Sequence, residues 1–244
     1  MDLGITGRRA AVAGASAGLG RACAEALAAE GVQVAICGRD QGRLDEVAAA
    51  SGVIPIVADV SQPDGARHFV AAARAALGGI DILVPNSGGP HPGGFADITD
   101  MDDYERAFEL NALSAIVMCH EAVPAMREQR WGRVVAITSI AVRQPIPSLI
   151  LSNTARAATT GFLKTLAGAV VADGVTVNSL QPGIHDTDRI RQLSGGNAAA
   201  GQPSGTIGDP ADFGAVCTFL CSEHARFITG AAIPVDGGAY AGLQ

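Results

Sequence analysis

Three glycines at a junction between a strand and a helix constrain this chain more than any other feature. They are Gly14, Gly18 and Gly20. Residues 10–13 before them form an apolar run that predicts a buried strand, and apolar residues after Gly18 recur at helical spacing. Glycines at such a turn let the backbone approach a pyrophosphate, whose charge is attracted by the free N–H groups of the following helix. The junction predicts a nucleotide site, although a glycine triplet alone is also typical of a plain tight turn.

Strand and helix patterns alternate along the rest of the chain. Further strands are expected at residues 32–36, 53–58, 80–85, 133–138, 175–178 and 232–235, and further helices at about 41–50, 63–77, 101–129, 149–172 and 210–221. Helices that connect successive strands in this way form right-handed crossovers, which require a parallel sheet. We therefore expect an α/β fold in which residues 1–244 form one Rossmann-type domain, with a doubly wound parallel sheet of about seven strands.

Composition and charge exclude several classes of function. The chain has 244 residues, of which 48% are hydrophobic and 17% charged, so a single domain can bury a large core. A net charge of −7 argues against a general binder of nucleic acids or anionic membranes. We find no apolar run long enough to span a membrane and no basic leader, and we expect a cytoplasmic protein. The cysteines lack metal-ligand spacing, so we expect reduced packing residues and no metal.

The stretch from Gln181 to Asp209 differs from the rest of the chain. It is rich in Gly, Ala, Ser and Pro, and it follows the carboxyl end of a predicted strand, where ligands bind in such folds. A long insertion of this kind usually covers a site or is disordered. We expect a mobile substrate lid at about residues 184–209, with a short helix near Asp188 to Leu193.

These patterns resemble the short-chain dehydrogenase/reductase family over essentially the whole chain. The glycine turn matches, with Ala13 where the family usually has threonine. The tail segments Ile228-Thr229-Gly230 and Val235-Asp236-Gly237-Gly238 also match, and in the family they contribute to a tetramer interface. The resemblance implies a homo-oligomer, either a tetramer or a dimer. It further implies that a dinucleotide contacts Gly14, Gly18, Leu19, Gly20, Asp59, Val60, Asn86, Ser87, Gly88, Pro182, Gly183 and Thr187.

The end of the second strand indicates which dinucleotide is bound. A carboxylate there would accept a hydrogen bond from the ribose 2′-hydroxyl, whereas an arginine would bind a 2′-phosphate. The chain has Arg39 at this position, no acid before Asp40, and Ser16 nearby in the glycine turn. We expect NADP(H) to be preferred over NAD(H). The alternative is that Arg39 is only a solvent-exposed residue at the start of a helix.

The catalytic half departs from the family pattern. Asn111 and Ser139 match the asparagine and serine of the family, but Ser152 stands where it has tyrosine and Arg156 where it has lysine. In the family the tyrosine gives its proton to the carbonyl oxygen, while the lysine lowers the pKa of that phenol and holds the nicotinamide ribose. Arg156 can still hold ribose hydroxyls, but a guanidinium does not shuttle protons. Loss of a positioned acid typically costs about 10² to 10⁴ in rate.

Few side chains are candidates for the missing proton donor. We expect Ser139 to polarise a substrate oxygen, and Ser152 to relay a proton through water that Asn111 helps to hold, as the family's asparagine does. His185 lies beside the expected nicotinamide site and His91 in a loop at the carboxyl edge of the sheet, where either is otherwise a solvated loop residue. The only tyrosines are Tyr104, expected in packing, and Tyr240, near the carboxyl terminus.

Three hypotheses remain open from the sequence. The first is an NADP(H)-dependent oxidoreductase for a small carbonyl or alcohol substrate, such as a carbonyl reductase, an alcohol dehydrogenase or a 3-oxoacyl reductase. The second is non-redox chemistry in which Ser139 and Arg156 bind an oxyanion or a leaving group. Halohydrin dehalogenases are a precedent, although they keep the tyrosine and fill the nucleotide pocket with bulk. The third is a catalytically silent nucleotide-binding protein.

Overall fold

The computed structural model describes residues 1–194, 198–199 and 202–243. Its centre is one parallel sheet of seven strands in the order β3-β2-β1-β4-β5-β6-β7. The strands are β1 (Arg9–Val12), β2 (Gln33–Gly38), β3 (Ile54–Val57), β4 (Ile82–Val84), β5 (Gly132–Ile137), β6 (Val175–Pro182) and β7 (Ala232–Val235). The predicted single-domain, doubly wound α/β fold is confirmed.

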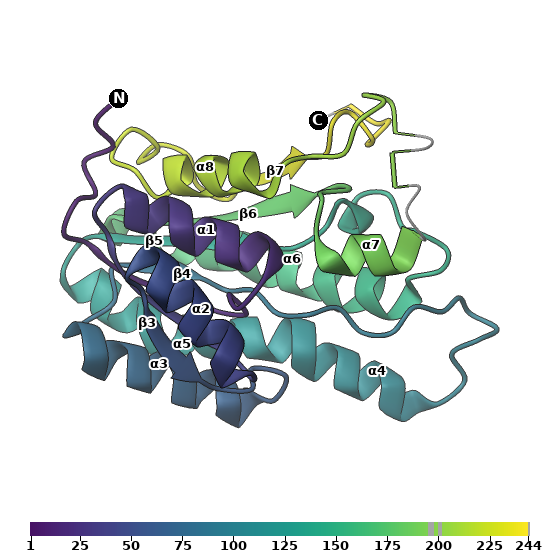
Figure 1. The fold of residues 1–244 in the computed structure, drawn as a ribbon, viewed down its shortest axis with the longest axis horizontal. Coiled ribbons are helices and arrows are strands. Elements are labelled where there is room, and N and C mark those ends of the chain that lie inside the picture. The colour runs from purple at the N-terminus through teal and green to yellow at the C-terminus, as the bar shows by residue number, and fades with distance from the viewer. Residues whose placement is uncertain (195–197, 200–201, 244) are drawn as a thin grey trace.

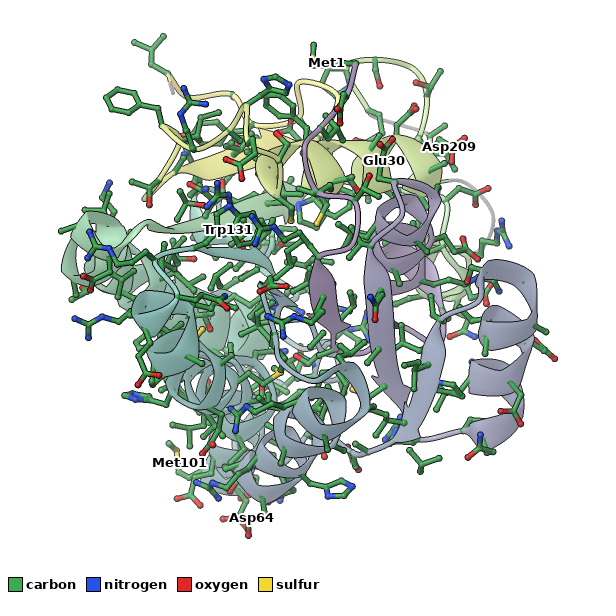
Figure 2. All side chains as sticks on the ribbon, turned by 90° about the vertical axis from the view of Figure 1, so that its left-hand side faces the viewer. Met1, Glu30, Asp64, Met101, Trp131 and Asp209 are labelled. Atoms are coloured by element: carbon green, nitrogen blue, oxygen red, sulfur yellow. The ribbon has the colours of Figure 1, made fainter. Side chains whose placement is uncertain are left out.

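Helices cover both faces of this sheet (Figure 1). One layer contains α1 (Gly18–Ala29), α2 (Gln41–Ser51) and α8 (Pro210–Leu220), and the other contains α3 (Pro63–Leu77), α5 (Ser114–Glu128) and α6 (Ile150–Val170). Alternate strand residues face opposite layers: Ala10 and Val12 pack toward α1, while Ala11 packs toward α3 and α5. Side chains fill both layers around the sheet, as Figure 2 shows.

The chain reverses its winding direction between β1 and β4. Strands β2 and β3 lie on one side of β1, and β4 to β7 follow on the other. In an open parallel sheet, this reversal leaves a crevice at the carboxyl ends of the two central strands. The glycine turn follows β1 and the loop with Asn86 follows β4, so both enter the same crevice.

Two predicted elements differ from the structure. The helix expected at residues 101–129 is divided into α4 (Met101–Phe108) and α5 by a π-helical turn, η1 (Glu109–Leu113). A π turn adds a residue without ending the apolar pattern, so a search for helical periodicity does not detect it. The strand expected to end at Asn178 runs to Pro182, because Pro182 stays in register with Val235 of β7.

The short helix that was expected near Asp188 to Leu193 is present, while the mobile lid stays a prediction. The structure places α7 (Asp188–Ser194) where a short helix was expected, and His185 pairs with Gly208 in an isolated parallel bridge that brings the two ends of the segment together. Residues 195–197 and 200–201 of the predicted lid lie outside the described residues. Two 3₁₀ turns complete the chain, η2 (Ile140–Val142) and η3 (Val171–Asp173). Among the described residues, no helix combines the length and the apolar character that crossing a membrane would require.

Candidate active site

The geometry of the glycine turn disfavours a side chain at each of its three glycines. Gly14 and Gly18 have φ angles of +56° and +58°, which L side chains rarely adopt. A Cβ on Gly20 would lie 2.5 Å from the carbonyl oxygen of Gly14. Asn86 holds that turn against the end of β4, since its Nδ2 donates to the carbonyls of Ala13 (3.2 Å) and Gly14 (3.0 Å). All three glycines are therefore required by the geometry.

The start of α1 offers its own hydrogen-bond donors. Its N-cap residue, Ala17, has no side chain able to cap the helix, and no acidic residue lies in the first turn. The first N–H groups of a helix have no partners within the helix, and the helix dipole makes this end attractive to anions. A phosphate group at this position would satisfy those donors.

A cavity of about 340 Å³ opens from the glycine turn toward the ends of β5 and β6. Its lining combines the turn, the loop after β4, the loop after β5, the first turns of α6, and the segment from Pro182 into α7. The predicted cofactor residues that line it are Gly14, Gly18, Leu19, Gly20, Asn86, Ser87, Gly88, Arg156, Pro182, Gly183 and Thr187. An open glycine turn, an uncapped helix and a cavity that continues past both are features that fit a dinucleotide.

The other predicted cofactor residues lie beyond this cavity, near the ends of β2 and β3. The Ser16 hydroxyl lies against Gly38, where a Cβ would come within 2.8 Å of its Oγ, and Arg39 is exposed next to it. The Oδ1 of Asp40 accepts from Arg43 N (3.0 Å) and caps α2. The nearest acid after β2 is therefore engaged elsewhere.

Asp59 and Val60, which the resemblance implies as dinucleotide contacts, follow the end of β3. Asp59 is exposed and its Oδ1 accepts from Ser61 N (3.0 Å), while Val60 is buried in the core.

Ser139 and Ser152 line the same cavity from different elements. Ser139 follows β5, and its Oγ accepts a hydrogen bond from Ala141 N (3.1 Å) as the N-cap of η2. Because this bond uses the oxygen as an acceptor, the hydroxyl hydrogen remains available to an oxygen in the cavity. Ser152 is half-buried in the first turn of α6.

Asn111 lies beneath the cavity, in the π turn η1. Its Nδ2 donates to Ser87 Oγ and to the carbonyl of Gly88, both at 2.8 Å. Its backbone carbonyl accepts from Thr159 Oγ1 (2.8 Å). Its buried Oδ1 accepts no hydrogen bond from the described residues. Asn111 and Arg156 share the lining of a small void of about 10 Å³, which is close to the space that one water needs.

Arg156 is fixed by backbone carbonyls. Its Nη1 donates to Ile137 (3.0 Å) and Thr138 (3.2 Å), and its Nη2 to Gly88 (3.4 Å). Burial lowers the pKa of this guanidinium to about 10, with a smaller contribution from the like charge of Arg189. Arg156 therefore stays charged at neutral pH and does not exchange protons there.

Arg189 of α7 lines the cavity and was not predicted from the sequence. Its Nη1 donates to the carbonyl of Gly89 (3.2 Å) and its Nη2 to that of Pro90 (3.0 Å), so α7 is bonded to the loop after β4. The only sequence signal is a cation two residues after Thr187 in the predicted lid helix. Its contacts depend on how α7 packs against the loop after β4, which local patterns do not show.

The histidine candidates lie in unlike surroundings. His185 lines the cavity with 4% of its surface exposed, and burial lowers its pKa, so the ring is neutral at pH 7. Its edge packs against Phe213 (5.2 Å between centroids) and Gly208. His91 pairs with Asp103 (3.0 Å) instead, and this bond raises the pKa of His91.

Within the described part of the chain, no tyrosine lines the cavity. Tyr104 packs beside a small cluster around Ile98, and the ring of Tyr240 lies 5.6 Å from the Arg143 guanidinium. Among the described residues, the side chains that line the cavity with Ser139 therefore include a second hydroxyl, two guanidinium groups and a neutral imidazole, but no phenol.

Comparison with known proteins shows similarity to reductases of one family over nearly the whole chain. The family described as enoyl-(acyl carrier protein) reductase matches residues 14–240. The chain is 32% identical to human dehydrogenase/reductase SDR family member 4 (96% of this chain and 88% of that protein) and 32% identical to the 3-oxoacyl-[acyl-carrier-protein] reductase FabG of Escherichia coli (98% and 99%). Its fold matches that of L-sorbose reductase from Gluconobacter frateurii complexed with NADPH and L-sorbose, with a TM-score of 0.91, 31% identity and full coverage of both chains.

Proposed function

The chain belongs to the short-chain dehydrogenase/reductase family, and from this premise we propose that it is an NADP(H)-dependent oxidoreductase that interconverts a small carbonyl compound and its alcohol. The observation that carries the proposal is one cavity that is lined by both the open glycine turn and Ser139. The relatives support it, since a 3-oxoacyl reductase and an NADPH-bound sugar reductase both reduce carbonyl groups.

At the cofactor end, the chain supplies backbone donors and a cation. The N–H groups at the start of α1 would bind the pyrophosphate. Ser16 and Arg39 would bind the 2′-phosphate of NADP(H), while the Asp40 carboxylate is bonded to the start of α2 through Arg43 N. When bound, the nicotinamide supplies or accepts the hydride. Pro182, Gly183 and Thr187 would fix the ring, and Arg156 the ribose.

At the substrate end, Ser139 is placed to donate to the carbonyl oxygen. Its Oγ accepts from Ala141 N, which fixes the position of the oxygen and leaves the hydroxyl hydrogen available to the substrate. Charge that develops on the substrate oxygen would be stabilised by this donor. Proton delivery would run through water adjoining Ser152, with Asn111 positioning the loop of Ser87 and Gly88 and helping to hold that water.

The missing phenol leaves two other activities open. The cavity would also suit non-redox chemistry in which Ser139 and Arg156 bind an oxyanion, or nucleotide binding without turnover. Two measurements separate these from the proposal. Fluorescence titration should show NADPH binding more tightly than NADH, and a panel of ketones and aldehydes should then cause NADPH consumption. Binding without consumption would favour a silent protein, and no binding of either dinucleotide would contradict the proposal.

The unusual proton route has its own test. The double variant Ser152→Tyr with Arg156→Lys restores the family pair, and we expect it to raise kcat because a phenol is a far stronger acid than an alcohol. An unchanged or lower kcat would indicate a site adapted to its own residues. Oligomerisation and a cytoplasmic location stay predictions.

A further inference from the structure

Two arginines in the cavity have no acidic partner among the described residues. Arg156 comes from α6 and Arg189 from α7, and both line the cavity with Ser139 and Ser152. Asp188 is the acid in the lining, and it bonds to Arg191 instead (3.2 Å). The six residues outside the described part of the chain include no acid. Two positive charges therefore share one cavity of a protein whose net charge is −7.

Both guanidinium groups bind the same short loop. Arg156 donates to the carbonyl of Gly88, and Arg189 to the carbonyls of Gly89 and Pro90. A guanidinium has five N–H donors, and carbonyls carry no charge to neutralise it. Each of the two arginines retains N–H groups beyond those used in these bonds, and those groups can bind a ligand that enters the cavity.

The two charges also repel each other. Partial burial lowers the pKa of Arg189, and burial together with the charge of Arg189 lowers that of Arg156. Neighbouring like charges in a partly buried site are destabilising unless an anion lies between them. Binding of an anion therefore stabilises the site.

We propose that the substrate of this enzyme carries an anionic oxygen group, a carboxylate or a phosphate. Arg189 binds it together with the N–H groups of Arg156 that the nicotinamide ribose leaves free, while Ser139 contacts the reacting carbonyl. The inference rests on the proposed function and specifies its substrate class. Planar guanidinium groups are suited to both anions because they donate parallel hydrogen bonds to two oxygens.

The position of Arg156 argues for the substrate as the source of the anion rather than the cofactor. Arg156 is bonded to the carbonyls of Ile137 and Thr138, which directly precede Ser139 in the chain. The cofactor's pyrophosphate belongs at the other end, on the glycine turn and the start of α1. An anion between the two arginines thus lies close to the residue that polarises the carbonyl.

Calorimetric titration tests this without requiring turnover. The protein is titrated, with and without NADP⁺, with two matched pairs: 4-oxopentanoate and its methyl ester, and dihydroxyacetone phosphate and dihydroxyacetone. We expect at least one anion to bind about 10-fold to 100-fold more tightly than its neutral counterpart. Equal affinity within both pairs would overturn the inference, while NADPH consumption with neutral ketones would leave the proposed function intact.

Variants of α7 test whether Arg189 causes the tighter binding of the anion. Arg189→Gln should remove most of the preference for the anion and leave the binding of the neutral compound and of NADPH unchanged, whereas Arg189→Lys should retain part of it. The matched control is Arg191→Gln on the same helix, which loses only surface pairs with Asp186 and Asp188. If Arg189→Gln instead weakens NADPH binding, or weakens acid and ester equally, the anion site belongs to the cofactor or does not exist.

Discussion

Gly20→Ala tests whether the glycine turn is as tightly determined as its geometry indicates. The added methyl carbon would lie 2.5 Å from Gly14 O and 2.7 Å from Asn86 Nδ2. Neither atom can yield freely, because Asn86 Nδ2 is bonded to Gly14 O (3.0 Å) and Gly14 has a left-handed backbone. The turn must therefore open, or α1 must move away from β1.

The expected cost combines two effects. Overpacking costs about 1–3 kcal/mol and a lost hydrogen bond about 1 kcal/mol, so we expect a destabilisation of about 2–4 kcal/mol. For a domain of this size that corresponds to a decrease in Tm of roughly 5–15 °C. Because the same turn should hold the pyrophosphate, NADPH affinity should fall by at least about tenfold.

The matched control is Gly161→Ala in α6, where a Cβ meets no atom within 4 Å. The same change there should stabilise the helix by about 0.5–1 kcal/mol, because alanine loses less backbone entropy than glycine. Thermal unfolding followed by circular dichroism and fluorescence titration with NADPH measure both variants. If Gly20→Ala keeps the wild-type Tm and NADPH affinity, the reasoning about the turn is wrong.

Three further predictions concern stability, catalysis and cofactor choice. Burial raises the pKa of Asp81, but hydrogen bonds from Arg9 outweigh burial and hold this pKa below its ordinary value. The pair of Arg9 and Asp81 therefore stabilises the fold above about pH 4. This contribution is lost as the pH falls through the lowered pKa. In urea unfolding, Arg9→Met should lose about 1–3 kcal/mol at neutral pH, and a deficit that does not shrink in acid would contradict the assignment. Asn111→Ala removes the bonds to Ser87 and Gly88 and should lower kcat about 10-fold to 100-fold, with steady-state rates as the readout; an unchanged kcat would exclude a role in positioning that loop. Arg39→Asp should weaken NADPH binding by about 10-fold or more while sparing NADH, and equal losses for both would show that Arg39 does not contact the 2′-phosphate.

Much of the fold could be predicted because its determinants are local. Buried parallel strands are short apolar runs, the connecting helices carry their own periodicity, and the glycines at residues 14, 18 and 20 mark the nucleotide turn by their lack of a side chain. The cavity brings together most of the predicted cofactor residues and three of the four predicted catalytic ones, Ser139, Ser152 and Arg156.

The remaining features depend on contacts between distant segments. The π turn places the Asn111 side chain under the loop after β4, and Thr159 of α6 donates to the backbone carbonyl of Asn111. Neither contact leaves a pattern in the sequence of residues 101–128. Arg189 acquires its place only when α7 packs beside Gly89 and Pro90. These contacts are found only from the structure because the residues that make them are about 20 to 100 positions apart in sequence.

We expect Ser139 and a bound NADPH to reduce a carbonyl without a phenol in the cavity. The most direct test is to supply NADPH deuterated at the transferable position, together with the carbonyl compounds, and to analyse the products by mass spectrometry. We predict an alcohol that carries deuterium at the former carbonyl carbon with the wild-type protein, and a yield lower by about 10² or more with Ser139→Ala. A protein that binds NADPH tightly and yet transfers no deuterium to any compound would contradict the account.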